Sequence, residues 1–272
     1  MDSFSMGGIL ALRENMTASS TRSLQSGRKR IKGGQKRTHA RPIAVFDIDG
    51  TIFRSSLAIE LVERLIQKKV FPKTARRAYE KEYERWRDRE GDYETYINKI
   101  VETLWGHLKG IPYKTVFRIA DKLISEKHRR VYRYTRGLVK TLKKKGYFLL
   151  AVSHSPRLVV EGFTKTMGFD KAYGSLAETD AWGRFTGNPI DFHLIADKAG
   201  ILKRVVVTAG LSLKGSVGVG DTESDIPFLS LVETPICFNP NMRLYRHALR
   251  RGWKIVVERK DVIYDAVRAK KP

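Results

Sequence analysis

Ile43-Ala-Val-Phe-Asp47-Ile-Asp49-Gly50-Thr51 is the stretch of this 272-residue chain that decides the fold. Its first four apolar residues predict a short strand that is buried on both faces. Residues i and i+2 of a strand point to the same side, so Asp47 and Asp49 are expected to reach one site. Two ionised carboxylates at the end of a buried strand are costly unless a divalent cation lies between them. The stretch therefore predicts a cation site in which one acid can act as nucleophile and the other as proton carrier.

The two residues that follow the acids are suited to a sharp turn and to a polar contact. Gly50 lets the backbone turn where other residues are strained, and Thr51 offers a hydroxyl near the start of a helix or loop.

Residues 55–145 are predicted to form an all-helical segment inserted directly after this strand. Apolar side chains recur at helical spacing, and Pro and Gly residues divide the segment into about four helices. The helical positions are Leu57, Leu61, Leu65, Ile97, Ile100, Leu104 and Leu108, and the breaks are Pro72, Gly91, Gly110 and Pro112. Tyr79, Tyr83 and Trp86 also keep helical spacing, which favours a packed seam of the bundle over a surface for stacking bases.

The remainder of the chain alternates between strands and helices. Strands are expected at residues 147–152, 171–179, 183–187, 216–219, 234–238 and 254–257, and a short C-terminal helix is expected after the last. Ser155 is a plausible N-cap for the helix after the second strand, Asn241 for the helix that ends at Arg251, and a single helix is expected over residues 191–209. This alternation indicates a mainly parallel α/β sheet, with its reactive loops at the carboxyl ends of the strands.

The composition limits the class of protein. No apolar run is long enough to span a bilayer, and the single cysteine, Cys237, lies in a predicted strand and is expected to be a small core residue. A reducing cytoplasm is the expected location. The formal net charge of +23 is compatible with a basic surface alone or with an anionic partner, either a membrane surface or nucleic acid. Residues 1–41 lack periodicity and are rich in Ser, Gly, Lys and Arg, so we expect a disordered basic tail.

Four separate segments offer groups that together suit phosphoryl transfer. The second strand ends in Ser153, a later helix carries Lys198, and the third strand ends in Gly220-Asp221-Thr-Glu-Ser-Asp225. Parallel strands would gather these groups beside Asp47 and Asp49 at one edge of the sheet. Phosphoryl transfer needs a nucleophile, a proton carrier and positive charge on the phosphate oxygens, and this set supplies all three. Each motif alone is common in proteins, and their occurrence in this order is what carries the prediction.

These four motifs resemble those of the haloacid dehalogenase-like superfamily. The resemblance covers roughly residues 42–258. More narrowly, the motifs resemble those of the phosphoserine-phosphatase-like branch, subfamily IB. That branch has a helical cap after the first motif, as in residues 55–145, and a second motif similar to Ser153-His154-Ser155-Pro156. The segments Gly183-Arg-Phe-Thr-Gly187 and Pro240-Asn-Met-Arg-Leu-Tyr245 are also similar to it. The resemblance implies a Rossmann-like α/β core, residues 42–54 and 146–272, and a C1-type cap, residues 55–145.

The resemblance also implies a role for each site residue. Asp47 would be the nucleophile and Asp49 the acid and base, with Mg²⁺ held by Asp47, the main-chain carbonyl of Asp49, and Asp221. Asp225 would orient Lys198 or a metal-bound water. The phosphate would be held by Gly50, Thr51, Ser153, Lys198 and His154, although His154 could instead only fill space beside Ser153.

The expected function is Mg²⁺-dependent hydrolysis of a small phosphorylated metabolite through an aspartyl-phosphate. Thr222 and Ser224 replace the Gly and Asn that phosphoserine phosphatases have in the fourth motif, which puts phosphoserine in doubt. Arg54 and Arg157 are candidates for contacts with the rest of the substrate. The alternatives are a phosphatase for lysophospholipids or nucleoside monophosphates, and a protein with weak activity that associates with polyanions through its basic tail and cap.

Overall fold

An eight-stranded, mainly parallel sheet organises the part of the chain that the computed structural model describes, residues 40–190 and 192–266. The strand order is β4-β3-β2-β1-β5-β6-β7-β8, and only β4 and β8 are antiparallel to their neighbours. The strands are β1 (Pro42–Phe46), β2 (Phe148–Pro156), β3 (Lys171–Thr179), β4 (Phe185–Ile190), β5 (Ser212–Gly220), β6 (Thr234–Phe238), β7 (Lys254–Arg259) and β8 (Val262–Ala266). The predicted tail falls outside the described residues as far as position 39.

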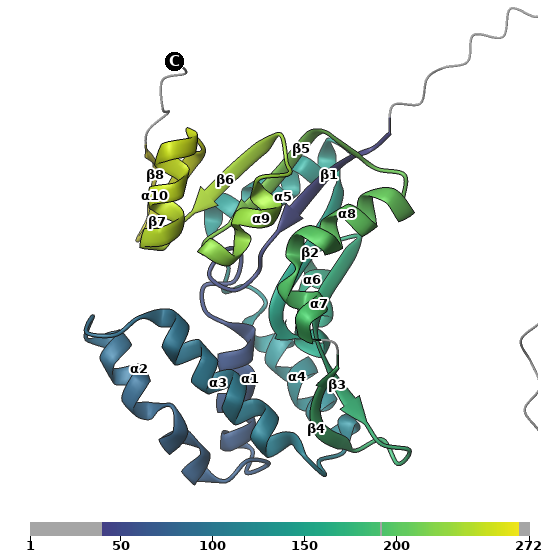
Figure 1. Ribbon diagram of the computed structural model, residues 1–272. Coiled ribbons are helices and arrows are strands. Elements are labelled where there is room, and N and C mark those ends of the chain that lie inside the picture. Colours follow the sequence, from purple (N-terminus) through teal and green to yellow (C-terminus); the bar gives the residue numbers. More distant parts are fainter. Residues whose placement is uncertain (1–39, 191, 267–272) are drawn as a thin grey trace, which may run out of the picture. The chain divides into compact units, whose positions relative to one another are not determined.

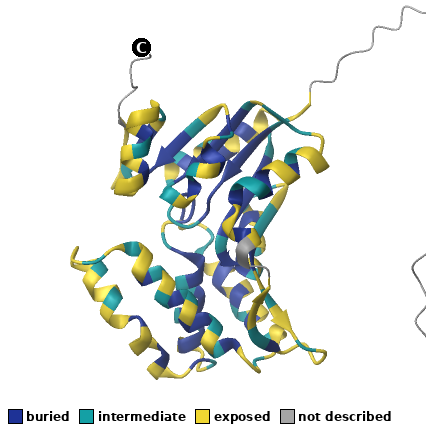
Figure 2. Cartoon of the chain, viewed as in Figure 1, coloured by how far each residue is buried: buried dark blue, intermediate teal, exposed yellow. Residues whose placement is uncertain are grey.

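Strand β1 lies in the middle of the sheet and is buried on both faces, as its apolar run predicts. Ala44 and Phe46 face one layer of helices, whereas Ile43 and Val45 face the other. The first layer contains α5 (Arg133–Lys144) and α6 (Arg157–Met167). The second contains α8 (Lys198–Thr208), α9 (Ile226–Leu229) and α10 (Met242–Arg251), and the short α7 (Phe192–Ala196) precedes α8. Figure 2 shows the buried central strands in dark blue between helices with exposed outer faces.

The segment between β1 and β2 is helical, and this confirms the predicted insertion of a C1-type cap. It contains α1 (Leu57–Gln67), η1 (Lys73–Ala78), α2 (Glu80–Arg87), α3 (Tyr93–Leu108), α4 (Tyr113–Lys127) and α5, and α1 to α4 lie together below the sheet in Figure 1. The aromatic residues form a packed seam, as predicted: the Trp86 ring stacks on Tyr96, with centroids 5.6 Å apart. Within the described residues, no helix has the length and apolar character needed to cross a membrane.

Three local predictions were wrong. Residues 262–266 form β8, which pairs with β7, where a C-terminal helix was expected. The helix predicted over 191–209 is two helices, because the Asp197 side chain caps α8 by accepting a hydrogen bond from the Gly200 N–H. Pro156 occupies the N-cap of α6 in place of Ser155, since β2 continues through that position.

Cys237 is buried in β6, and Asn241 caps α10 by accepting from the Leu244 N–H, both as predicted.

Candidate active site

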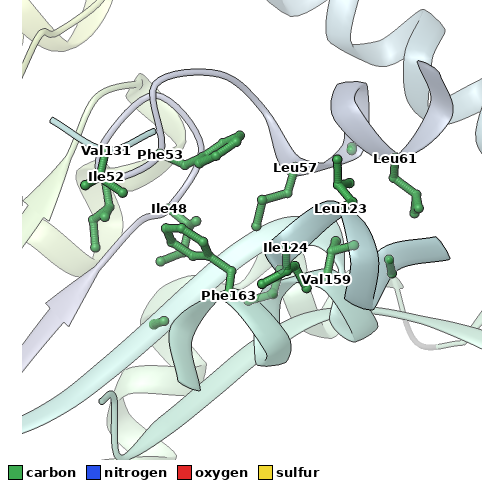
Figure 3. Close-up of a cluster of buried hydrophobic side chains, with 14 of the residues drawn as sticks. Ile48, Ile52, Phe53, Leu57, Leu61, Leu123, Ile124, Val131, Val159 and Phe163 are labelled. Atoms are coloured by element: carbon green, nitrogen blue, oxygen red, sulfur yellow. The ribbon is translucent and has the colours of Figure 1, made fainter. Parts of the chain in front are cut away.

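The two acids of the opening stretch follow β1, and a buried isoleucine separates them. Asp47 is buried and its backbone N–H donates to the Val219 carbonyl of β5 at 2.9 Å. Ile48 points into the apolar cluster that joins the loop after β1 to α1, α4 and α6 (Figure 3). That cluster also contains Phe53 and Phe163, whose rings meet edge to face at 5.4 Å. The apolar contacts of Ile48 therefore fix the backbone between the acids.

A tight turn follows the second acid. The Gly50 N–H donates to the carbonyls of Phe53 and Ser55, at 3.0 and 3.2 Å. Gly50 has a φ of 78°, which favours glycine, and a Cβ at this position would collide with the Asp221 carboxylate. The turn thus brings the first motif and the fourth motif into contact. Thr51 strengthens that contact, because its buried hydroxyl donates to Asp221 at 3.2 Å.

Three hydrogen bonds hold the carboxylate of Asp49. Its Oδ2 accepts from the hydroxyls of Ser153 and Ser155, at 2.6 and 2.7 Å. Its Oδ1 accepts from the N–H of Leu57 in the first turn of α1, at 2.6 Å. Burial raises the pKa of Asp49, and this effect outweighs the hydrogen bonds that favour its ionised form. Asp49 is therefore both fixed in orientation and inclined to hold a proton.

Ser155 is a site residue that the sequence prediction assigned to a helix cap. Because β2 continues to Pro156, Ser153 and Ser155 are two apart in a strand and face the same acid. The Ser155 hydroxyl also accepts from the Ala58 N–H at 3.0 Å, so it joins β2 to α1. The signal that could have found it is the Ser-x-Ser spacing, which repeats the Asp-x-Asp spacing of the neighbouring strand.

Lys198 links the first and fourth motifs from the first turn of α8. Its Nζ lies 2.7 Å from Asp47 Oδ1 and 2.7 Å from Asp225 Oδ1, and all three side chains are buried. Burial alone would lower the pKa of Lys198, but the charges of Asp225 and Asp47 outweigh it and raise that pKa. Lys198 therefore stays cationic beside Asp47, as a group that neutralises phosphate oxygens must.

Asp225 organises the loop after β5. Its Oδ2 accepts from the backbone N–H groups of Asp221 and Thr222, at 3.0 and 3.1 Å, while its Oδ1 holds Lys198. Asp225 therefore contacts Lys198, and its role in orienting Lys198 for the reaction stays a prediction.

The acid groups at the ends of β1 and β5 suit a divalent cation. Carboxylate oxygens of Asp47, Asp221 and Asp225 all lie within 4.8 Å of one another. Burial and the neighbouring acids raise the pKa of Asp47 to about 8, and burial and Asp47 raise that of Asp221 well above its usual value. Hard carboxylate oxygens that repel one another are the donor set that Mg²⁺ stabilises. Because Asp225 is engaged by Lys198 and two N–H groups, Asp47 and Asp221 are the side chains that would hold the ion.

His154 lies between the two serines in sequence, but it faces a different environment. Burial, and then the charge of Lys198, lower its pKa to about 4, so its imidazole is neutral near pH 7. Its carbonyl accepts from the Ser175 hydroxyl of β3 at 2.5 Å.

Two tyrosines of the inserted segment also lie near the acids, and the sequence analysis did not single them out. The pKa of Tyr93, in the first turn of α3, is raised by burial and then by the charges of Asp49 and Asp221. The pKa of Tyr132, which precedes α5, is raised by burial and then by Asp221. Helical spacing alone cannot separate such side chains from those of the core.

A family model described as haloacid dehalogenase-like hydrolase matches residues 44–230, which include every acid of this site. The chain belongs to this family. Among curated relatives, a phosphoserine phosphatase SerB1 of Mycobacterium tuberculosis is 30% identical over 138 residues, or 50% of this chain and 44% of the relative. A histidinol-phosphatase of Neisseria meningitidis is 23% identical and covers 79% of this chain and 97% of its own.

The solved structures support the same fold. A phospho-aspartyl intermediate analogue of phosphoserine phosphatase covers 82% of this chain and 95% of its own, with a TM-score of 0.54 and 22% identity. The resemblance to the family and to its phosphoserine-phosphatase-like branch is therefore confirmed. The chain spans a little under half the length of its Mycobacterium tuberculosis relative.

Proposed function

We propose that the protein is a Mg²⁺-dependent phosphatase that hydrolyses a small phosphorylated metabolite through an aspartyl-phosphate on Asp47. The observation that carries this proposal is the different environment of the two acids. Asp47 Oδ1 lies beside the cationic Lys198 and within the acid cluster that a divalent cation would keep ionised, whereas Asp49 is held by the hydroxyls of Ser153 and Ser155 and by the Leu57 N–H. One carboxylate is thus suited to attack phosphorus, and the other to hold a proton.

Different residues of this site carry out different steps of the proposed reaction. Asp47 attacks the phosphorus atom while Lys198 neutralises phosphate oxygens. The N–H groups near Gly50 can bind these oxygens, and the Ser153 hydroxyl would turn from Asp49 to do the same. Asp49 donates a proton to the leaving oxygen and then accepts one from the water that hydrolyses the aspartyl-phosphate. A Mg²⁺ ion held by Asp47, the Asp49 carbonyl and Asp221 would reduce the repulsion between the carboxylate and the dianionic phosphate.

The test is phosphate release from a panel of phosphomonoesters with Mg²⁺, with para-nitrophenyl phosphate as the general substrate. The panel includes phosphoserine, nucleoside monophosphates and lysophosphatidic acid, so that the alternative substrate classes are compared directly. We expect turnover by the wild type and a loss of about 10³-fold or more in Asp47→Asn. Equal activity of the two proteins would overturn the mechanism.

We also propose that the cap contacts an anionic partner, because a basic cavity lies between α1 and α4. The cavity, of about 270 Å³, is lined by Arg64, Lys68, Thr115, Arg118, Ile119 and Lys122. Arg64 pairs with Glu126 at 2.6 Å. Lys68, the C-cap of α1, and Arg118 and Lys122 of α4 add three further cations to the lining, and an anion would reduce the repulsion among them.

The anionic contact is tested by salt-dependent binding to phosphatidylserine vesicles and to short RNA. The double variant Arg118→Gln/Lys122→Gln should bind more weakly than Lys165→Gln/Lys171→Gln, which removes the same charge from another surface. Equal binding by the two variants would show that the cavity has no such role. The cytoplasmic location stays a prediction.

A further inference from the structure

Trp182 is the most exposed large apolar side chain in the described part of the chain. It is 84% exposed in the turn between β3 and β4, which projects at the lower right in Figure 1. Tyr113 and Phe117, one turn apart on α4, are 39% and 48% exposed. Single apolar residues at a surface need no explanation, but three aromatic side chains on adjacent segments mark an interaction site. We call Tyr113, Phe117 and Trp182 the aromatic patch.

Backbone hydrogen bonds hold the two segments of the aromatic patch together. The Tyr113 N–H donates to the Gly183 carbonyl at 2.9 Å, and the Gly110 N–H donates to the Phe185 carbonyl at 2.7 Å. The Tyr113 ring also packs on the rings of Phe117 and Phe185, with centroids 6.0 and 5.7 Å apart. Phe185 is buried, so it anchors the turn to the inserted segment. The aromatic patch is therefore fixed at its base and offers a preformed surface.

The turn that carries Trp182 is ordered although its indole is in solvent. The Asp180 carboxylate accepts from the N–H groups of Trp182 and Arg184, at 3.0 and 2.8 Å. The Arg184 guanidinium donates to the Gly110 carbonyl at 2.9 Å, which ties the turn to the residues before α4. A side chain on an ordered backbone loses less entropy when a partner covers it. The exposure of Trp182 is thus built into the turn.

A row of cations flanks the aromatic patch. Lys114, Arg118 and Lys122 follow one another at intervals of one turn on α4, on the face next to that of the aromatic side chains. Residues 109–122 contain these three cations and Lys109 against a single acid, Asp121. Among residues 40–190 and 192–266, no ion pair includes any of these four cations. The charge beside the aromatic patch is therefore positive and complements an anionic surface.

Exposed aromatic rings beside a row of cations are typical of a surface that docks on an anionic lipid bilayer. Trp and Tyr rings favour the headgroup region, where the body of the ring is buried and its polar atom stays hydrated. Lys and Arg beside them attract the anionic headgroups. Single-stranded nucleic acid fits less well, because base stacking needs free ring faces and the Tyr113 ring already packs on two phenylalanines. An anionic bilayer is therefore the partner whose chemistry matches.

We propose that the aromatic patch inserts into the headgroup region of an anionic membrane surface while the cations of α4 contact the lipid headgroups. This inference rests on the proposed contact with an anionic partner and names that partner, and it does not depend on the phosphatase reaction. Arg118 and Lys122 also line the basic cavity between α1 and α4, so both features lie along the same helix. Burial of aromatic area supplies the hydrophobic part of the binding free energy, and the cations supply the salt-sensitive part.

The experiment measures co-sedimentation of the full chain with vesicles of phosphatidylcholine, with and without about one third phosphatidylserine. We expect the wild type to bind the anionic vesicles, and Trp182→Ala and Phe117→Ala each to weaken that binding by about 10-fold. Tyr264→Ala is the matched control, because it removes an exposed aromatic ring from β8, and it should bind like the wild type. The tryptophan emission should shift to shorter wavelength on binding, and Trp182→Phe should lose that shift while it keeps most of the affinity.

The outcomes separate insertion of the aromatic patch from the wider anionic contact and from catalysis. If Trp182→Ala and Phe117→Ala bind vesicles as tightly as Tyr264→Ala, insertion is overturned, and the cavity variant Arg118→Gln/Lys122→Gln still tests the anionic contact. Absence of vesicle binding by the wild type overturns insertion, and binding to short RNA that depends on Trp182 would assign the patch to nucleic acid instead. A dimer that Trp182→Ala dissociates, seen by sedimentation, would assign it to a second copy of the chain. Hydrolysis of para-nitrophenyl phosphate tests the phosphatase function separately from all of these.

Discussion

A single residue separates Asp47 from Asp49, yet the surroundings of the two carboxylates favour different chemistry. Asp47 lies beside two buried charged groups, Lys198 and Asp225, that are themselves paired. Asp49 has no cation within hydrogen-bond reach among the described residues and depends on the serines of β2. The chain has left β1 at Asp47 and enters the tight turn of Gly50 after Asp49, and Ile48 is anchored in the core between them, so each acid meets its own partners.

Ser155→Ala tests how far the serines control the proton carrier. The substitution removes a buried hydroxyl that donates to Asp49 and accepts from the Ala58 N–H. We expect the free energy of unfolding to fall by about 1–3 kcal/mol, and turnover to fall because Asp49 is less well held. Chemical denaturation and steady-state rates measure the two effects. Ser125→Ala, at an exposed position of α4, should change neither, and a similar loss there would contradict this account.

The sequence predicted the acids and Lys198 because each follows or begins an element whose pattern is clear. Ser155 was misassigned because a serine before a Pro is also a good helix cap, and only the length of β2 distinguishes the two. The tyrosines Tyr93 and Tyr132 were not predicted at all. Their burial depends on how α3 and the residue before α5 are placed in three dimensions, which the spacing of apolar residues along the sequence does not show.

At the scale of elements, the close approach of β3 to β2 keeps the second motif in place. A Cβ on Gly174 would lie 2.7 Å from the Arg157 Cα and 2.8 Å from the Ser155 carbonyl, and both are backbone atoms that cannot move separately. The β2–β3 register also shifts between Val152 and Pro156, next to the same motif. Glycine is therefore required at this point of the sheet.

Gly174→Ala should lower the free energy of unfolding by about 1–3 kcal/mol and reduce turnover, since the strain falls on the strand that carries Ser153 and Ser155. Gly137→Ala is the matched control: it lies inside α5 with open space around it and should be neutral or stabilise by about 0.5–1 kcal/mol. Thermal and urea unfolding distinguish them. Equal effects of the two changes would mean that the contact with β2 is easily relieved.

The sequence was least informative about elements whose partners are distant or late in the chain. Val262-Ile-Tyr264 has the β-branched and aromatic residues of a strand, but a run this short is also compatible with a helix. Pairing with β7 decides between them, so tertiary context overrides local preference.

At the scale of the whole molecule, the buried acids make stability depend on pH and on Mg²⁺ together. The pKa of Asp47 rises from 3.8 to about 8 on folding, so the folded protein holds the extra proton between these values. Without metal, stability is therefore greatest below the unfolded pKa and falls as pH rises toward 8. Mg²⁺ binds the ionised acids, so its stabilising effect should grow over the same interval.

We expect the thermal midpoint in EDTA to fall between about pH 5.5 and pH 8, and the increase produced by Mg²⁺ to be larger at the higher pH. Differential scanning fluorimetry of wild type and Asp47→Asn measures both quantities. The variant should show a smaller fall with pH and a smaller response to Mg²⁺. A midpoint in EDTA that rises across this interval would contradict the assignment of Asp47 as a destabilising buried acid.

The insertion of the helical segment immediately after the first motif also shapes how the chain reaches this structure. Ile43 of β1 pairs with Phe148 of β2, about 100 residues later, and Val45 pairs with Gly218 of β5, farther still. Contacts of such long range form late, because the entropy of closing the intervening chain opposes them until the partners are ordered. During synthesis, α1 to α4 leave the ribosome before either neighbour of β1. The apolar strand that leads to Asp47 therefore stays unpaired until β2 and β5 have been synthesised.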